Sequence, residues 1–60
     1  MEHAEIADTL RRAGASLEVL ERMYEKDPAV QTLSVTARDL VACVGALLER
    51  LERLEAAQRG

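Results

Sequence analysis

The chain has 60 residues, of which eleven are acidic and eight are basic, and its formal net charge is −3 at pH 7. A domain of this size draws only about 3–5 kcal/mol from its core unless a disulfide, a metal or a partner subunit adds to it. The single cysteine and single histidine exclude an intrachain disulfide and a zinc site made of such ligands within one copy. Association with other chains remains as the source of added stability.

The composition is rich in alanine, leucine, glutamate and arginine, and it includes one proline and one aromatic residue. This mixture favours long helices and approaches that of coiled coils. The longest apolar run, residues 40–48, is much shorter than the roughly 20 residues that a membrane span needs. No basic, apolar leader is visible at the N-terminus. We therefore expect a cytoplasmic protein that does not contact a membrane.

The first predicted helix covers about residues 3–26. Its apolar residues recur at alternating intervals of four and three, as in the seam of a heptad pattern: Ile6, Leu10, Ala13, Leu17, Leu20 and Tyr24. Gly14 interrupts this pattern, and we interpret it as a point where another helix packs closely. Asp27 and Pro28 end the helix, because proline cannot continue the hydrogen-bond ladder.

The predicted corner covers residues 27–35, and the second predicted helix covers about residues 36–58. Thr36 and Asp39 resemble a capping box at the start of this helix, with Ser34 as a competing cap. Asp27 can also cap a short turn that has Pro28 at its first position. The seam of the second helix again alternates between intervals of four and three: Leu33, Ala37, Leu40, Val44, Leu47, Leu51 and Leu54.

Two helices of equal length joined by a short corner predict an all-α, single-domain antiparallel hairpin. Pairing the two seams from the corner outward gives a register that the structure can test. Tyr24 should lie near Ala37, Leu20 near Leu40, and so on outward to Leu10 near Leu51.

The second helix has more apolar surface than such a hairpin needs. Residues 40–48 carry no charged side chain on any face, and Val41 and Leu48 extend the apolar surface beyond the seam. Monomers rarely expose such a patch. We therefore predict a homodimeric four-helix bundle. Its predicted interface comprises Val41, Val44, Leu48, Leu40, Leu47, Cys43, Gly45, Met23 and Gly14.

No catalytic, metal-binding or cofactor-binding constellation is recognisable, so we expect no enzyme and no cofactor. His3 lies at the N-terminus, the glycines are isolated, and no Glu-x-x-His pair of a di-iron bundle is present. Cys43 lies in an apolar stretch, which predicts a buried, inert thiol. The arginines are interleaved with acids, a pattern that does not favour nucleic-acid binding.

The segments Leu10-Arg11-Arg12-Ala13 and Leu20-Glu21-Arg22-Met23 resemble the first helix of the all-helical copper-sensing repressors. Those proteins are also oligomeric bundles, and they hold copper with cysteine and histidine ligands. The ligands have no counterpart here, because Asp39 and not histidine lies one turn before Cys43. We therefore assign the chain to no family.

The sequence predicts a non-enzymatic helical module that pairs with itself and binds another protein, as a small adaptor or inhibitor does. One alternative is a small regulator of transcription or of a toxin, in which the bundle serves dimerisation. Another is a subunit whose helices complete a larger helical complex.

Overall fold

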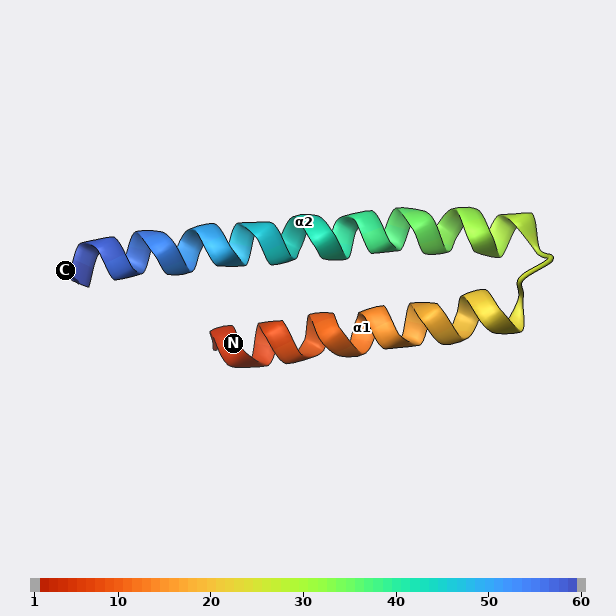
Figure 1. The fold of residues 1–60 in the computed structure, drawn as a ribbon, viewed down its shortest axis with the longest axis horizontal. Helices are drawn as coiled ribbons and strands as arrows, with labels where there is room; N and C mark the ends of the chain where they lie inside the picture. Colours follow the sequence, from red (N-terminus) through yellow and green to blue (C-terminus); the bar gives the residue numbers. More distant parts are fainter. Residues whose placement is uncertain (1, 60) are drawn as a thin grey trace.

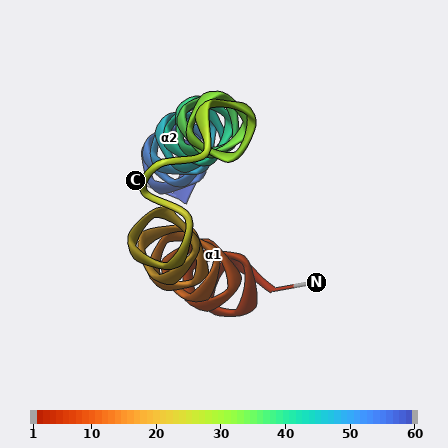
Figure 2. The same cartoon turned by 90° about the vertical axis from the view of Figure 1, so that its right-hand side faces the viewer.

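The computed structural model describes residues 2–59 and consists of two helices packed side by side in antiparallel directions. Helix α1 covers His3–Met23 and helix α2 covers Pro28–Arg59. Figure 1 shows that a short corner joins them, and Figure 2, which looks from the corner end, shows a single layer of two helices. The all-helical hairpin is thereby confirmed.

The two helices differ in length, contrary to the prediction. Helix α1 has 21 residues and α2 has 32. At a rise of 1.5 Å per residue these are about 31 and 48 Å long, and the longest extent of the molecule is 51 Å. Helix α2 therefore spans the whole molecule, and its C-terminal end projects beyond the start of α1 (Figure 1). We call residues 50–59 the overhang.

The predicted corner over residues 27–35 is wrong, because α2 begins at Pro28. The carboxylate oxygen Oδ1 of Asp27 accepts hydrogen bonds from the backbone N–H groups of Ala29 at 3.0 Å and Val30 at 3.3 Å. Asp27 is thus the N-cap, and Pro28 occupies the first helical position, where its missing N–H costs nothing. The Thr36–Asp39 capping box does not form, since both residues lie inside α2.

A cap at Asp27 lets a stretch of weak helix formers continue the helix. Residues 30–36 contain several β-branched and hydroxyl side chains, which favour other conformations. The hydroxyl of Thr36 donates instead to the carbonyl of Thr32 at 3.0 Å, within the helix. Gln31 stabilises the corner from the other side, because its Nε2 donates to the carbonyls of Glu21 at 3.3 Å and Tyr24 at 3.1 Å. Glu21 lies in the last turn of α1, where carbonyls lack intrahelical partners. The carbonyl of Tyr24, the residue after the helix, also accepts a hydrogen bond from the backbone N–H of Asp27 at 3.0 Å.

The Asp27→Ala variant should lose about 1 kcal/mol of unfolding free energy, because the first backbone N–H groups of α2 lose their cap. Urea unfolding followed by circular dichroism measures the loss. Asp39→Ala is the matched control, since Asp39 is an exposed residue inside the helix. Destabilisation by Asp39→Ala and none by Asp27→Ala would place the helix start at the capping box instead.

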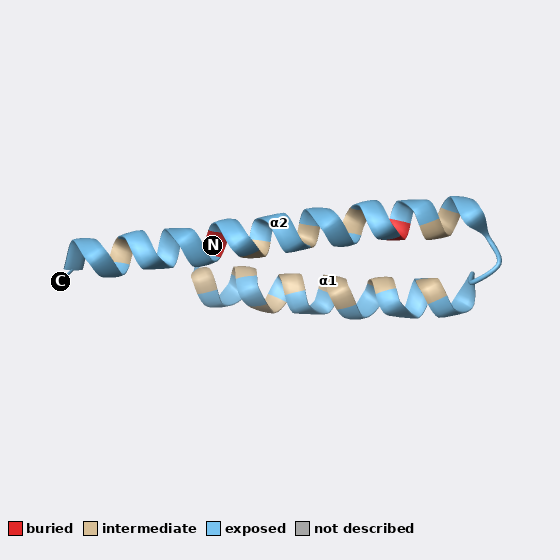
Figure 3. Cartoon of the chain, turned by 45° about the horizontal axis from the view of Figure 1, so that its top comes forward, coloured by how far each residue is buried: buried red, intermediate tan, exposed pale blue. Residues whose placement is uncertain are grey.

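The hairpin buries few of its side chains. Among the described residues only Leu48 and Ser34 are buried, with exposed fractions of 8% and 3%. The half-buried residues of α1 line the side that faces α2 (Figure 3). On α2 four of the inward residues recur at every seventh position, and we call them the inner column: Ser34, Val41, Leu48 and Glu55. Ala37 and Gly45, beside this column, are half-buried as well.

The inner column replaces the seam that the sequence predicted for α2. Ala37 lines a groove together with Leu17 and Leu20, and not beside Tyr24 as expected. The physical reason is the early start of α2, which places Ala37 nine residues beyond Pro28 and so farther from the corner. The predicted register is therefore wrong, although the antiparallel direction is right.

Two polar contacts between residues that are far apart in the sequence also connect the helices. Arg38 donates to both carboxylate oxygens of Glu21, with distances of 2.9 Å from Nε and 2.6 Å from Nη2. At the other end of α1, Nε2 of His3 lies 3.2 Å from Oε1 of Glu55. Such exposed pairs add little stability, but a bidentate arginine fixes geometry.

Gly14 and Gly45 are not points of close approach within the hairpin, contrary to the interpretation of Gly14. A Cβ atom added at either position would meet no atom within 4 Å. Both glycines lie in regular helix without positive φ. They therefore cost helix stability, and the hairpin gains no packing from them.

The Gly14→Ala variant should accordingly raise the unfolding free energy by about 0.5–1 kcal/mol. The reverse change at the neighbouring exposed position, Ala15→Gly, should lower it by a similar amount. Thermal unfolding of both variants at one protein concentration provides the measurement. A destabilised Gly14→Ala variant would show that another helix does pack against this position.

Candidate protein-interaction surface

The most prominent surface of the molecule is an apolar stripe on α2 that no other described part of the chain covers. We call it the outer stripe, and its members are Leu33, Leu40, Val44, Leu47, Leu51 and Leu54. Leu40 and Leu47, near its middle, are 63% and 62% exposed. With Ala37 these residues make the heptad pattern of the sequence, which is typical of a helix that packs against another helix.

The structure separates the predicted interface residues into two groups. Leu48 is buried, and Val41, Gly45 and Gly14 are half-buried. The remaining predicted residues are exposed: Leu40, Val44, Leu47, Met23 and Cys43. The prediction that Val41 and Leu48 lie beside the intramolecular seam is wrong, because they belong to the inner column. Cys43 is exposed in a single copy, so its thiol is not buried within the hairpin.

The predicted seam of the second helix was assigned to the wrong contact. Apart from Ala37, its residues were expected to face the first helix, and the structure leaves them exposed on the outer stripe: Leu33, Leu40, Val44, Leu47, Leu51 and Leu54. The heptad spacing correctly marks them as members of one stripe. Periodicity alone does not tell which of two neighbouring apolar stripes faces α1.

An apolar groove lies between the helices near the corner, where the outer stripe begins. Its volume is about 350 Å³, and it is lined by Leu17, Leu20, Val30, Leu33, Ser34 and Ala37. Leu33 belongs both to this groove and to the outer stripe, so the two surfaces are continuous. We call this surface the corner groove. A side chain that enters it would contact almost only apolar groups.

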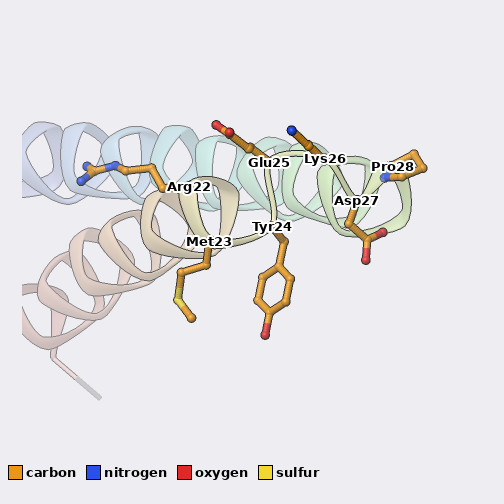
Figure 4. A pocket seen from close by; sticks show the side chains of 7 residues that line it. All are labelled: Arg22, Met23, Tyr24, Glu25, Lys26, Asp27 and Pro28. Atoms are coloured by element: carbon orange, nitrogen blue, oxygen red, sulfur yellow. The ribbon is translucent and has the colours of Figure 1, made fainter.

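A second depression surrounds the corner itself, with a volume of about 610 Å³. It is lined by seven consecutive residues, from Arg22 to Pro28. Figure 4 shows that their side chains point in different directions, with Glu25 and Lys26 on one side and Met23 and Tyr24 on the other. A small-molecule site needs polar groups that converge on the ligand. Within residues 2–59 no group of three or more histidine, cysteine or acidic residues is placed to hold a metal ion.

Most arginines lie next to carboxylates. Arg11 and Arg12 contact Asp8, Arg22 lies 3.7 Å from Glu18, and Arg53 lies 3.8 Å from Glu49. Together with the Arg38–Glu21 pair, these contacts place a carboxylate beside five arginines of residues 2–59, whereas a phosphate-binding face has basic side chains free of such partners.

Helix α2 is long and apolar enough, by length and composition alone, to cross a membrane. Each stretch of 18 residues in α2 with at most two charged residues contains both Arg38 and Asp39. A charged residue near the centre of a bilayer costs about 2.5–3.5 kcal/mol. The outer stripe also covers only one side of the helix, which is more typical of packing against protein.

Comparisons with protein-family models, curated proteins and solved structures found no match to this chain.

Proposed function

We propose that the protein is a non-enzymatic helical interaction module that works as a homodimer, with the four helices of two copies forming a bundle. In this role it acts as a small adaptor or inhibitor that binds another protein. The observation that carries the proposal is the outer stripe, which runs along α2 and is exposed in a single copy.

The positions of the two apolar surfaces on α2 suit a bundle. At 3.6 residues per turn, the inner column lies roughly 90° around the helix from the middle of the outer stripe. A helix in a four-helix bundle has two nearest neighbours at about this angle, as at the corner of a square. The inner column serves α1, and the outer stripe is available to a helix of the second copy.

The exposed area agrees with this arrangement. The chain exposes 4980 Å², whereas a compact monomer of 6.6 kDa should expose roughly 3,900 Å². The difference of roughly 1,100 Å² is similar to the ~800 Å² that each partner contributes to a standard protein interface. One neighbour of similar size therefore suffices to cover the excess.

Sedimentation equilibrium between about 1 and 100 μM tests the proposal, since homodimers of this interface size fall in the micromolar range or tighter. We expect a species of twice the chain mass. A stable, folded monomer throughout this range would contradict the proposal. A weakly helical chain that folds only after mixing with a copurifying protein would favour the subunit of a larger complex, and salt-dependent retention on DNA would favour the nucleic-acid regulator.

A further inference from the structure

The two ends of the hairpin carry surfaces that complement each other but lie too far apart to meet within one chain. One end has the overhang, which presents Leu51 and Leu54 and projects beyond the start of α1 (Figure 1), so that its polar contact with α1 is the one between Glu55 and His3. The other end has the corner groove, whose lining is apolar and which extends onto α1 through Leu17 and Leu20. Both belong to the same face of the molecule, because the outer stripe runs from one to the other.

We infer that the second copy packs antiparallel along the outer stripe, so that the overhang of each copy covers the corner groove of the other. This inference rests on the homodimer proposed above and adds the orientation of the two copies and the occupant of the groove. The heptad pattern allows it, since in an antiparallel pair Leu40 lies opposite Leu51 of the second copy, and Ala37 lies opposite Leu54.

The unequal lengths of α1 and α2 distinguish the antiparallel dimer from a parallel one. In a parallel pair both overhangs would lie at the same end, where only two helices would pack together, and each corner groove would face the corner of the other copy instead of an overhang. In the antiparallel pair each overhang lies beside the corner end of its partner, where α1 is also present. Nearly all of the 51 Å length then contains at least three helices, and each overhang lies beside the groove of the other copy in one symmetric contact.

The excess exposed area and the charges at the two ends of the hairpin favour a second copy of the chain as the partner that covers the corner groove. The excess exposed area matches one partner of standard size. The overhang has both signs of charge next to its two leucines, in Glu52 and Arg53. Glu21 and Arg38, which follow the groove residues Leu20 and Ala37 in the chain, form an ion pair and also supply both signs. The overhang and the groove therefore do not repel each other. Because the dimer has a twofold axis, the same contact between overhang and groove forms twice.

Cross-linking tests the orientation. In a Cys43→Ala background, Thr36→Cys and Ala57→Cys place single thiols next to the stripe and leave its leucines intact. A short bismaleimide should link the two variants to each other when they are mixed, because the antiparallel pair brings residue 57 beside residue 36 of the second copy. Ala57→Cys alone should give no covalent dimer, since its two thiols then lie at opposite ends of the assembly.

The results separate the orientation from dimerisation itself. A dimer in which Ala57→Cys cross-links with itself is parallel, and it would overturn the antiparallel arrangement while the proposed function stands. A chain that sediments as a monomer would overturn both.

A second measurement does not depend on cross-linking. Leu20 lies on α1 in the corner groove, whereas its neighbour Val19 is exposed outside that groove. Leu20→Glu should raise the dimer dissociation constant at least about tenfold, because the overhang of the second copy would bury the new charge. Val19→Glu should leave it within about threefold of the parent, as exposed surface positions do. Equal effects of the two substitutions would show that the groove is not covered.

Discussion

The variants Leu40→Glu and Leu47→Glu should sediment as monomers at concentrations where the parent chain is a dimer. Both residues lie in the middle of the outer stripe, and the twofold axis places each new carboxylate in the interface twice. Burial of unpaired charge should cost about 3 kcal/mol or more per dimer, which raises the dissociation constant by over a hundredfold. Sedimentation equilibrium measures this change directly.

Val35→Glu is the matched control for these two variants. Val35 is also an exposed apolar residue of α2, with an exposed fraction of 56%, but it lies outside the outer stripe. We expect its dissociation constant to remain within about threefold of the parent. If the three glutamate variants weakened the dimer equally, the loss would reflect general surface polarity, and the outer stripe would not be the interface.

Leu48→Ala should destabilise the hairpin itself by about 2–4 kcal/mol, since Leu48 is the buried apolar residue of the inner column. A loss of this size approaches the whole stability expected of a core in so short a chain. Leu48→Glu should therefore leave the chain largely unfolded, although the sequence placed Leu48 in the dimer interface. Far-UV circular dichroism with urea unfolding measures both variants.

Leu47→Ala, at the adjacent position, separates loss of the hairpin from loss of the dimer. Its effect should depend on protein concentration and disappear at dilutions where the parent is also monomeric. The effect of Leu48→Ala should persist at every concentration. A concentration-dependent loss in Leu48→Ala and a constant one in Leu47→Ala would exchange the roles of the inner column and the outer stripe.

The local sequence was sufficient to predict two helices and the break between them. The heptad spacing, the scarcity of β-formers outside residues 30–36, and Asp27-Pro28 are local signals, and each acts within one or two turns. The start of α2 was harder to predict because three capping signals compete within ten residues: Asp27, Ser34 and Thr36. Asp27 prevails because it caps the backbone directly before a proline at the first helical position, and Gln31 adds bonds to the end of α1.

The sequence by itself also determined that α2 carries more apolar surface than one neighbour can cover, because this follows from counting apolar residues around a helix. Only the tertiary structure decided which part of that surface faces α1. Val41 and Leu48 of the inner column lie roughly 90° around α2 from the outer stripe, so apolar side chains are present on both faces. Which face of α2 packs against α1 depends on the direction in which the chain leaves the corner. In this structure Ser34, Val41 and Leu48 face α1. The leucines of the outer stripe are left for another chain.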